Sequence, residues 1–191
     1  MRNSTCIDSA SLNKGPPPKG TTLKIKERMI WYKKFAVAFS YPEGDFFIFF
    51  PEQKKVKAGL PLEYDRLFRS FEVWLYGAEY VIENEFQRVQ TLADISGFYK
   101  AFGLEAELNR PDALSCELEF MHYLVFREMN APDKEKVRTC FSAEKKFFLQ
   151  HLYPQAKKFA EKLRLHTRNK FYLEISECLS NFLESERKIY R

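Results

Sequence analysis

Three carboxylates stand in or beside an apolar stretch that runs from Asp112 to Val125, and they are the side chains of this sequence best suited to chemistry. Asp112 follows a proline, while Glu117 and Glu119 lie inside the helix predicted to begin there. Carboxylates are rarely buried in an apolar helix unless cations or N–H groups satisfy them. The three acids could be a helix cap and two internally satisfied groups. Alternatively, they could form an acidic rim that binds guanidinium groups through paired, charge-assisted hydrogen bonds.

An apolar stripe precedes these carboxylates. Spacings of three and four residues place its members on one face of a helix predicted to open at Pro61 or Leu62 and to end at Gly77. The stripe consists of Tyr64, Leu67, Phe68, Phe71, Trp74 and Leu75. It could belong to the core, or it could line an apolar groove beside the acidic rim. Within the stripe we expect Leu67 to be the more buried and Phe68 the more exposed to a ligand.

Helix caps and periodicity predict the elements that position the acids. Thr91, with Asp94 three residues later, forms an acidic capping box for a helix that a glycine at position 103 ends. Asp112, beside Pro111, is predicted to cap the next helix. Apolar residues cover most of the circumference of this second helix, so we expect it in the middle of the fold.

The rest of the chain has helical periodicity. The run from Phe46 to Phe50 could be a strand, but no second run could pair with it, so we interpret it as a short buried helix. Further helices are predicted over 23–41, 78–90 and 169–187, and a long one begins at Asp133 and is bent or divided at Pro154. The sequence therefore predicts an all-α, single-domain bundle of about eight to ten helices.

Motifs for covalent or metal chemistry are incomplete. Phosphate-binding glycine loops and hydrolase nucleophile elbows are absent from the sequence. Glu119 and His122 have the Glu-x-x-His spacing of di-iron bundles, but such a site needs a second pair, and neither His151 nor His166 follows a glutamate at that spacing. We interpret His122 as a partly buried structural histidine. These motifs predict no catalytic residue, no metal and no cofactor; a protein that only binds its partner needs no covalent chemistry, so for that class of function we expect a protein that is not an enzyme.

Two segments resemble the signatures of a known family. PDALSCELEFMHYL, preceded by ADISGFYKAFGLE, is similar to the second signature of the TorD/DmsD/NarJ-like redox-enzyme maturation chaperones. Tyr64-Asp65-Arg66-Leu67-Phe68 resembles the Tyr-x-x-Leu-Phe segment of the same family, and the likeness extends from about Met29 to Leu183. Ala113 stands where the family has a histidine, and the segment between the signatures lacks the prolines that members often carry there.

The resemblance implies an all-α chaperone. It would bind the twin-arginine signal peptide, or the apo catalytic subunit, of a molybdenum-cofactor oxidoreductase, and would delay export until the cofactor is inserted. Carboxylates would hold the arginine pair and the apolar stripe would hold the following apolar segment. The peptide-binding residues so predicted are Tyr64, Leu67, Phe68, Phe71, Trp74, Glu83, Pro111, Asp112, Glu117 and Glu119.

Charge is distributed unevenly along the chain. The segment from Glu63 to Glu128 holds 13 acidic and 6 basic residues, a net charge of −7, so the remainder carries +12. An acidic middle suits a cationic peptide, although solvated helix faces of opposite sign would give the same pattern. Residues 1–22 are expected to be a loosely attached tail and residues 23–191 the chaperone domain. With no long apolar run and no leader, we expect a cytoplasmic protein.

Two other classes of function remain open from the sequence. The basic flanks, over 24–34 and 134–170, would suit a helical regulator that binds nucleic acid. A metal or redox enzyme is the third class. No nucleic acid and no membrane span are expected for the chaperone, and both a monomer and a helix-exchanged dimer are compatible with the sequence.

Overall fold

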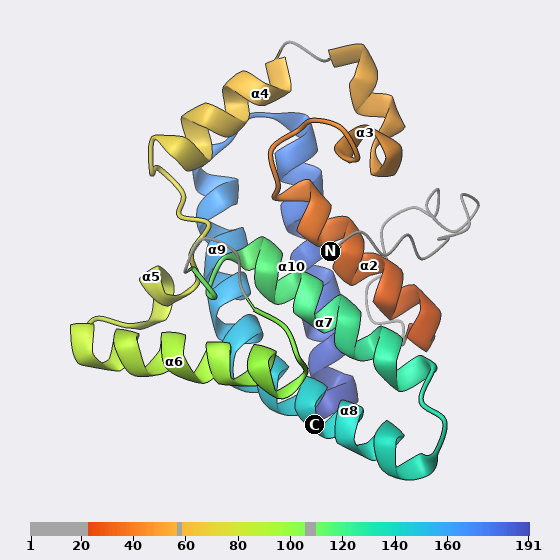
Figure 1. Cartoon of the computed structure of the whole chain (residues 1–191). Coiled ribbons are helices and arrows are strands. Elements are labelled where there is room, and N and C mark those ends of the chain that lie inside the picture. The colour runs from red at the N-terminus through yellow and green to blue at the C-terminus, as the bar shows by residue number, and fades with distance from the viewer. Residues whose placement is uncertain (1–22, 57–58, 106–109) are drawn as a thin grey trace.

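The computed structural model describes residues 23–56, 59–105 and 110–191, and helices make up most of this part of the chain (Figure 1). In chain order these are α2 (Ile25–Ala38), α3 (Phe46–Phe49), the 3₁₀-helix η1 (Pro51–Val56), α4 (Gly59–Tyr64), the π-helical turn η2 (Asp65–Arg69), α5 (Ala78–Val81), α6 (Glu85–Ala101), α7 (Leu114–Met129), α8 (Lys134–Phe147), the π-helical turn η4 (Phe148–Leu152), α9 (Tyr153–His166) and α10 (Lys170–Tyr190). The all-α, single-domain bundle is confirmed. The tail predicted over residues 1–22 lies outside the described residues.

Helix α7 lies in the middle of the bundle, as predicted. It runs beside α2 on one side and α8 on another, while α9 and α10 pack against each other behind it (Figure 1). Leu118, Met121, Leu124 and Val125 are completely buried along its length. Burying a large apolar side chain contributes roughly 1.5–3 kcal/mol, so this wide apolar surface fixes α7 as the element around which the others pack.

The long C-terminal hairpin also follows the sequence signals. Asp133 caps α8, because its Oδ1 accepts a hydrogen bond from the backbone N–H of Lys136 (2.8 Å). Pro154 lacks an N–H and its ring crowds the preceding turn, and the chain accommodates it by widening into the π-helical turn η4 before α9 begins. The helix predicted to be bent or divided at Pro154 is thus interrupted by this π-helical turn, while its backbone stays helical from α8 into α9. Asn169 then caps α10 through the N–H groups of Phe171 and Tyr172.

The capping box predicted at Thr91 is wrong. Helix α6 begins two turns earlier, after Asn84, whose side chain accepts from the N–H of Phe86 (2.8 Å). Thr91 lies inside the helix, and the predicted helix over 78–90 is instead split between α5 and the start of α6. The predicted stop is confirmed: Gly103 has a φ of 73°, and the N–H of Leu104 donates to the carbonyl of Tyr99 (2.9 Å) in a Schellman motif.

The predicted helix up to Gly77 is also wrong, because the chain leaves the helix at Ser70. Phe71 takes a φ of 63°, a left-handed conformation that costs a non-glycine residue about 1–2 kcal/mol. Residues 70–77, here called the strap, then run beside the start of α7. The N–H of Leu114 donates to the carbonyl of Leu75 and the N–H of Gly77 to that of Asp112, both at 2.8 Å. These hydrogen bonds stabilise the extended conformation of the strap over a continuation of the helix.

The five-residue apolar run after residue 45 forms the short helix α3, as expected. Phe46 and Phe50 are buried against Phe171 of α10, with ring centroids 5.5 and 5.0 Å away. Ile48 points outward and is 59 % exposed. The run is therefore a helix with one buried face.

Candidate functional site

Asp112 is completely buried at the junction between the strap and α7. Its Oδ2 accepts from the backbone N–H of Ala78 (3.3 Å), the first residue of α5, and its Oδ1 accepts from Nε of Arg110 (3.2 Å). The N-cap of α7 is Ala113, which makes no side-chain capping bond, so the prediction that Asp112 caps α7 is wrong. Asp112 instead ties the N-terminus of α5 to the start of α7.

The turn that carries Asp112 is fixed from two sides. The hydroxyl of Tyr99, on α6, donates to the carbonyl of Pro111 (2.7 Å), and Pro111 is itself buried. Ala113 forms an antiparallel bridge with Tyr76 of the strap. Backbone contacts thus hold this turn in place and set the direction of the Asp112 carboxylate.

Glu117 lies one turn further along α7 and is also completely buried. The Gln155 amide nitrogen, in the orientation that satisfies both side chains, donates to both Glu117 oxygens at 3.1 Å. Burial and then the nearby charge of Asp112 hold the pKa of Glu117 well above its usual range. Gln155 also explains why position 77 is a glycine, because a Cβ there would lie 1.7 Å from the end of the Gln155 amide group. The structure therefore brings Asp112 and Glu117 together, as the sequence predicted.

Two arginines lie beside this carboxylate pair at the protein surface. The guanidinium of Arg110 stacks over the ring of Tyr76, with 3.5 Å between its central carbon and the ring centroid. Its Nη2 lies 3.7 Å from Glu79 Oε1, and Arg88 of α6 hydrogen-bonds to the same Glu79 oxygen. The strap, α5, α6 and the start of α7 thus meet in a cluster of alternating charges around one aromatic ring.

The apolar stripe is divided between core and surface. Tyr64, Leu67 and Phe68 are buried, and Phe68 packs edge-on against Tyr172 (5.5 Å between centroids). The expectation that Phe68 faces a ligand is therefore wrong for this structure. Phe71 and Trp74 lie on the strap instead, where Phe71 is 54 % exposed and stacks on Trp74 at 4.5 Å. Phe71 and Trp74 are thus the aromatic members of the stripe that are not buried.

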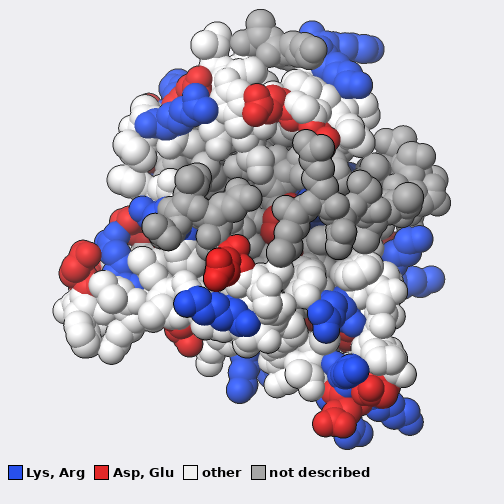
Figure 2. Space-filling model, in the orientation of Figure 1, with Lys and Arg blue, Asp and Glu red and all other residues white. Residues whose placement is uncertain are grey.

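Two predicted acids stand apart from this cluster. Glu119 pairs with Lys33 of α2, and because it follows Glu117 by two residues it points to a different side of α7. Glu83 is exposed in the short link between α5 and α6. On the face shown in Figure 2, acidic and basic side chains are interspersed and form no continuous field of one sign.

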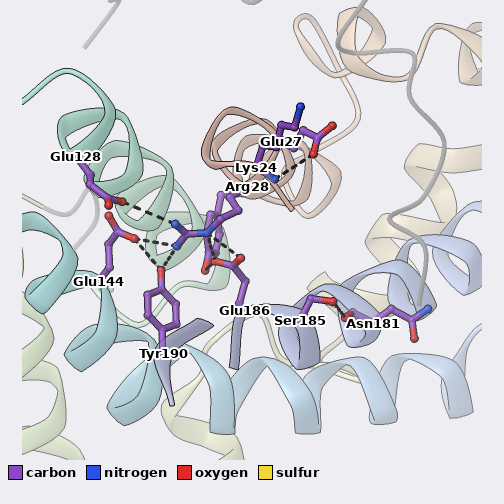
Figure 3. Close-up of polar contacts among 10 residues, drawn as sticks. Lys24, Glu27, Arg28, Glu128, Glu144, Asn181, Ser185, Glu186 and Tyr190 are labelled. Atoms are coloured by element: carbon purple, nitrogen blue, oxygen red, sulfur yellow. Dashed lines mark hydrogen bonds and ion pairs between the residues drawn. The ribbon is translucent and has the colours of Figure 1, made fainter. Parts of the chain in front are cut away.

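Sequence reasoning missed a second buried polar cluster, at the other end of α7 (Figure 3). Arg28 of α2 donates from Nε to Glu186 (2.9 and 3.0 Å) and from Nη2 to Glu144 (2.9 Å). The hydroxyl of Tyr190 donates to Glu144 (2.8 Å), and that of Tyr32 donates to Glu186 (2.8 Å). We call these five residues the Arg28 cluster. The one local signal is that Arg28 shares the buried face of α2 with Tyr32, and this signal does not identify the distant partners Glu144 and Glu186.

Two histidines, His122 and His151, have structural partners. Nδ1 of His122 lies 2.9 Å from the carbonyl of Met29, as suits a partly buried structural histidine. His151 of η4 bonds through Nε2 to Asp94 of α6 (2.8 Å), at a hollow of about 380 Å³ that Thr91 also lines. Burial lowers the pKa of His151 despite the carboxylate beside it. Among the described residues, no group of three or more His, Cys, Asp or Glu side chains could hold a metal ion.

A second hollow, of about 620 Å³, opens between α3 and α4. Pro42, Phe47, Ile48 and Pro61 give it an apolar wall, and Glu43 and Lys54 stand at its edge. Leu62, nearby on α4, is 71 % exposed. The sequence did not predict this hollow, because its walls come from short elements whose relative placement depends on the whole fold.

Comparison with known proteins agrees with this architecture. Residues 45–161, more than half of the chain, match the profile of the protein family described as nitrate reductase delta subunit. No individually curated protein matches the sequence significantly. Within the part of the chain that the structure describes, no helix is long and apolar enough to cross a membrane. The chain belongs to the nitrate reductase delta subunit family, a TorD-like family of redox-enzyme maturation chaperones that act on molybdoenzymes and are not themselves catalysts.

Proposed function

We propose that this protein binds the twin-arginine signal peptide and the apo catalytic subunit of a molybdenum-cofactor oxidoreductase in the cytoplasm. Binding would hold the client until its cofactor is inserted and would delay its export. The observation that carries the proposal is the family match, which covers both the strap and the Asp112 turn within residues 45–161. The nitrate reductase named by the family is the first client to test.

The polar part of the proposed site is the end of the bundle where Asp112 and Glu79 lie. An arginine side chain needs carboxylates in its plane and accepts an aromatic ring against its face. Asp112, Glu79 and Tyr76 offer these groups within a few ångströms of one another, as their contacts with Arg110 demonstrate. A twin-arginine peptide carries the matching chemistry.

The apolar part of the proposed site is the strap. A signal peptide continues from its arginines into an apolar stretch, which binds to exposed aromatic rings rather than to buried ones. Phe71 and Trp74 form a stacked pair on the same strap that carries Tyr76. Leu67 and Phe68, which are buried members of the predicted peptide-binding residues, would then pack in the core beside the strap without touching the peptide.

Isothermal titration with a synthetic peptide tests the proposal. The peptide carries an Arg-Arg pair followed by an apolar segment, and a second peptide carries Lys-Lys in its place. We expect the Arg-Arg peptide to bind more tightly, because a lysine ammonium lacks the planar fork that pairs with carboxylates. Equal affinity for the two peptides, or no measurable binding of either, would contradict the proposal.

A pair of matched surface substitutions locates the apolar contact. Phe71→Ser removes an exposed ring from the strap, whereas Phe86→Ser removes an exposed ring from α6, where Phe86 is 70 % exposed. We expect only Phe71→Ser to weaken peptide binding, by about 1–2 kcal/mol for the loss of one aromatic contact. Equal effects of the two substitutions would move the apolar contact away from the strap.

A further inference from the structure

Asp112 already holds a guanidinium group in this structure, and that group belongs to the chain itself. Arg110 donates to Asp112 Oδ1 from Nε (3.2 Å), lies over the ring of Tyr76 (3.5 Å) and approaches Glu79 with Nη2 (3.7 Å). We call Tyr76, Glu79 and Asp112 the guanidinium cage. A ring face and two carboxylates are the kinds of partner that an arginine side chain binds.

Two walls of the cage, Tyr76 and Asp112, are held by backbone contacts, whereas its occupant Arg110 is at the surface. Tyr76 forms the bridge to Ala113, Asp112 precedes Ala113, and Asp112 is further fixed by the N–H of Ala78. Glu79 follows on α5 and is held by Arg88. The side chain of Arg110, in contrast, is 37 % exposed. The cage would therefore keep its shape if Arg110 turned outward into solvent.

We propose that the cage binds one arginine of the client peptide and that Arg110 occupies it as an internal competitor in the unbound chaperone. This inference rests on the function proposed above. Arg110 is two residues from Asp112, so its effective concentration at the cage is high. The apparent affinity for a peptide arginine is then reduced in proportion to the fraction of molecules whose cage is free. Arg88 also hydrogen-bonds to Glu79 and lies next to the cage.

A purely structural Arg110 makes the opposite prediction. If its role were to neutralise buried Asp112, its removal would disturb the turn and weaken peptide binding. If it is a competitor, its removal leaves the cage intact and strengthens binding. The sign of the change in affinity therefore separates the two roles.

Titration of the Arg-Arg peptide into three variants tests this directly. For Arg110→Gln we expect the dissociation constant to fall roughly five- to tenfold, the scale of losing a competing surface ion pair with a stacked ring. Glu79→Gln removes a charge from the cage and Tyr76→Leu removes its aromatic ring, so each should weaken binding. Arg69→Gln is the matched control: Arg69 also pairs with a carboxylate (Asp65, 3.0 Å) and lies over a tyrosine (Tyr41, 4.6 Å), but outside the cage. The Arg69→Gln variant should bind the Arg-Arg peptide with the affinity of the wild type.

A second measurement does not depend on mutants. The Nε–H resonance of Arg110 should shift towards its solvent-exposed position when the peptide is added to the wild-type protein. If Arg110→Gln folds with an unchanged melting temperature but binds no more tightly than wild type, the competitor role is overturned while the proposed function stands. If the Nε–H resonance stays unmoved at saturating peptide, the competitor role is overturned too. If wild type and all variants fail to bind either peptide, the proposed function itself fails.

Discussion

The two ends of α7 treat buried carboxylates in different ways. At one end Glu144 and Glu186 share Arg28, a cation that is 4 % exposed and enclosed by α2, α8 and α10 (Figure 3). At the other end the cation beside Asp112 is Arg110, whose side chain is partly exposed. Glu117 accepts hydrogen bonds from the Gln155 amide. A cation sealed inside the fold cannot be exchanged, whereas one at the surface can. We therefore propose a structural role for the Arg28 cluster and a role in recognition for the Asp112 site.

The largest expected effect is the loss of Arg28. Arg28→Met leaves the buried Glu186 without a counter-charge, and we expect the free energy of unfolding to fall by roughly 3–5 kcal/mol, as for other broken buried ion pairs. Chemical denaturation measures the change. Arg127→Met, at an exposed site on α7, is the control and should change stability by less than about 0.5 kcal/mol. A loss as small as that of the control would show that the Arg28 cluster is not a structural clamp.

The next effect separates the core from the exposed part of the apolar stripe. Phe68→Ala should destabilise the fold by about 3–5 kcal/mol, because it empties a buried site between Tyr64 and Tyr172. Phe71→Ser should change stability by less than about 1 kcal/mol, since it removes an exposed ring. Melting curves of the two variants decide this. Similar losses would mean that the strap belongs to the core and offers no surface to a peptide.

A smaller effect concerns pH. Burial raises the pKa of Glu144 to about 8, although Arg28 opposes the shift. The folded state then keeps a proton that the unfolded chain loses near pH 4.5, so Glu144 contributes stability at low pH that is lost as the pH rises towards 8. The slope from this one group is at most about 1.4 kcal/mol per pH unit. Denaturation of Glu144→Gln between pH 5 and 8 should show a shallower decline than wild type; an identical decline would contradict the assignment.

The smallest expected change in stability follows from Asp112→Asn. The amide oxygen still accepts from the N–H of Ala78, and the lost attraction to Arg110 is that of a partly exposed pair, which is worth about 0–1 kcal/mol. Removing the charge of Asp112 also favours ionised Glu117, because that charge raises the pKa of Glu117. We expect a change in the free energy of unfolding within about 1 kcal/mol by denaturant titration. A loss of several kcal/mol would place Asp112 among the structural acids.

Several elements could be predicted because their signals are local. The apolar circumference of α7, the cap at Asp133, the proline at 154 and the stop at Gly103 each act within a few residues. The helix extended to Gly77 failed for a different reason. Aromatic spacings of three and four predict a helix, and they do not show that backbone bonds to α7, nearly 40 residues away, favour an extended strap.

The candidate site was predicted in part for a similar reason. Because Asp112 follows a proline, the sequence predicted that it caps a helix. The helix N-terminus that it binds is that of α5 and not that of α7. The division of the stripe into buried Phe68 and exposed Phe71 depends on the turn at Ser70, which no periodicity indicates. The Arg28 cluster joins residues more than 100 positions apart, so only the tertiary fold brings it together.

The most direct test of recognition at Asp112 is the affinity of Asp112→Asn for the Arg-Arg peptide, measured by isothermal titration beside wild type. Asparagine keeps the bond to α5 and loses the charge that holds a guanidinium group. We predict that binding weakens by roughly 1.5–3 kcal/mol, the scale of a hydrogen bond to a charged group, while the melting temperature stays close to that of wild type. Undiminished affinity would show that Asp112 only joins α5 to α7 and that the peptide binds elsewhere.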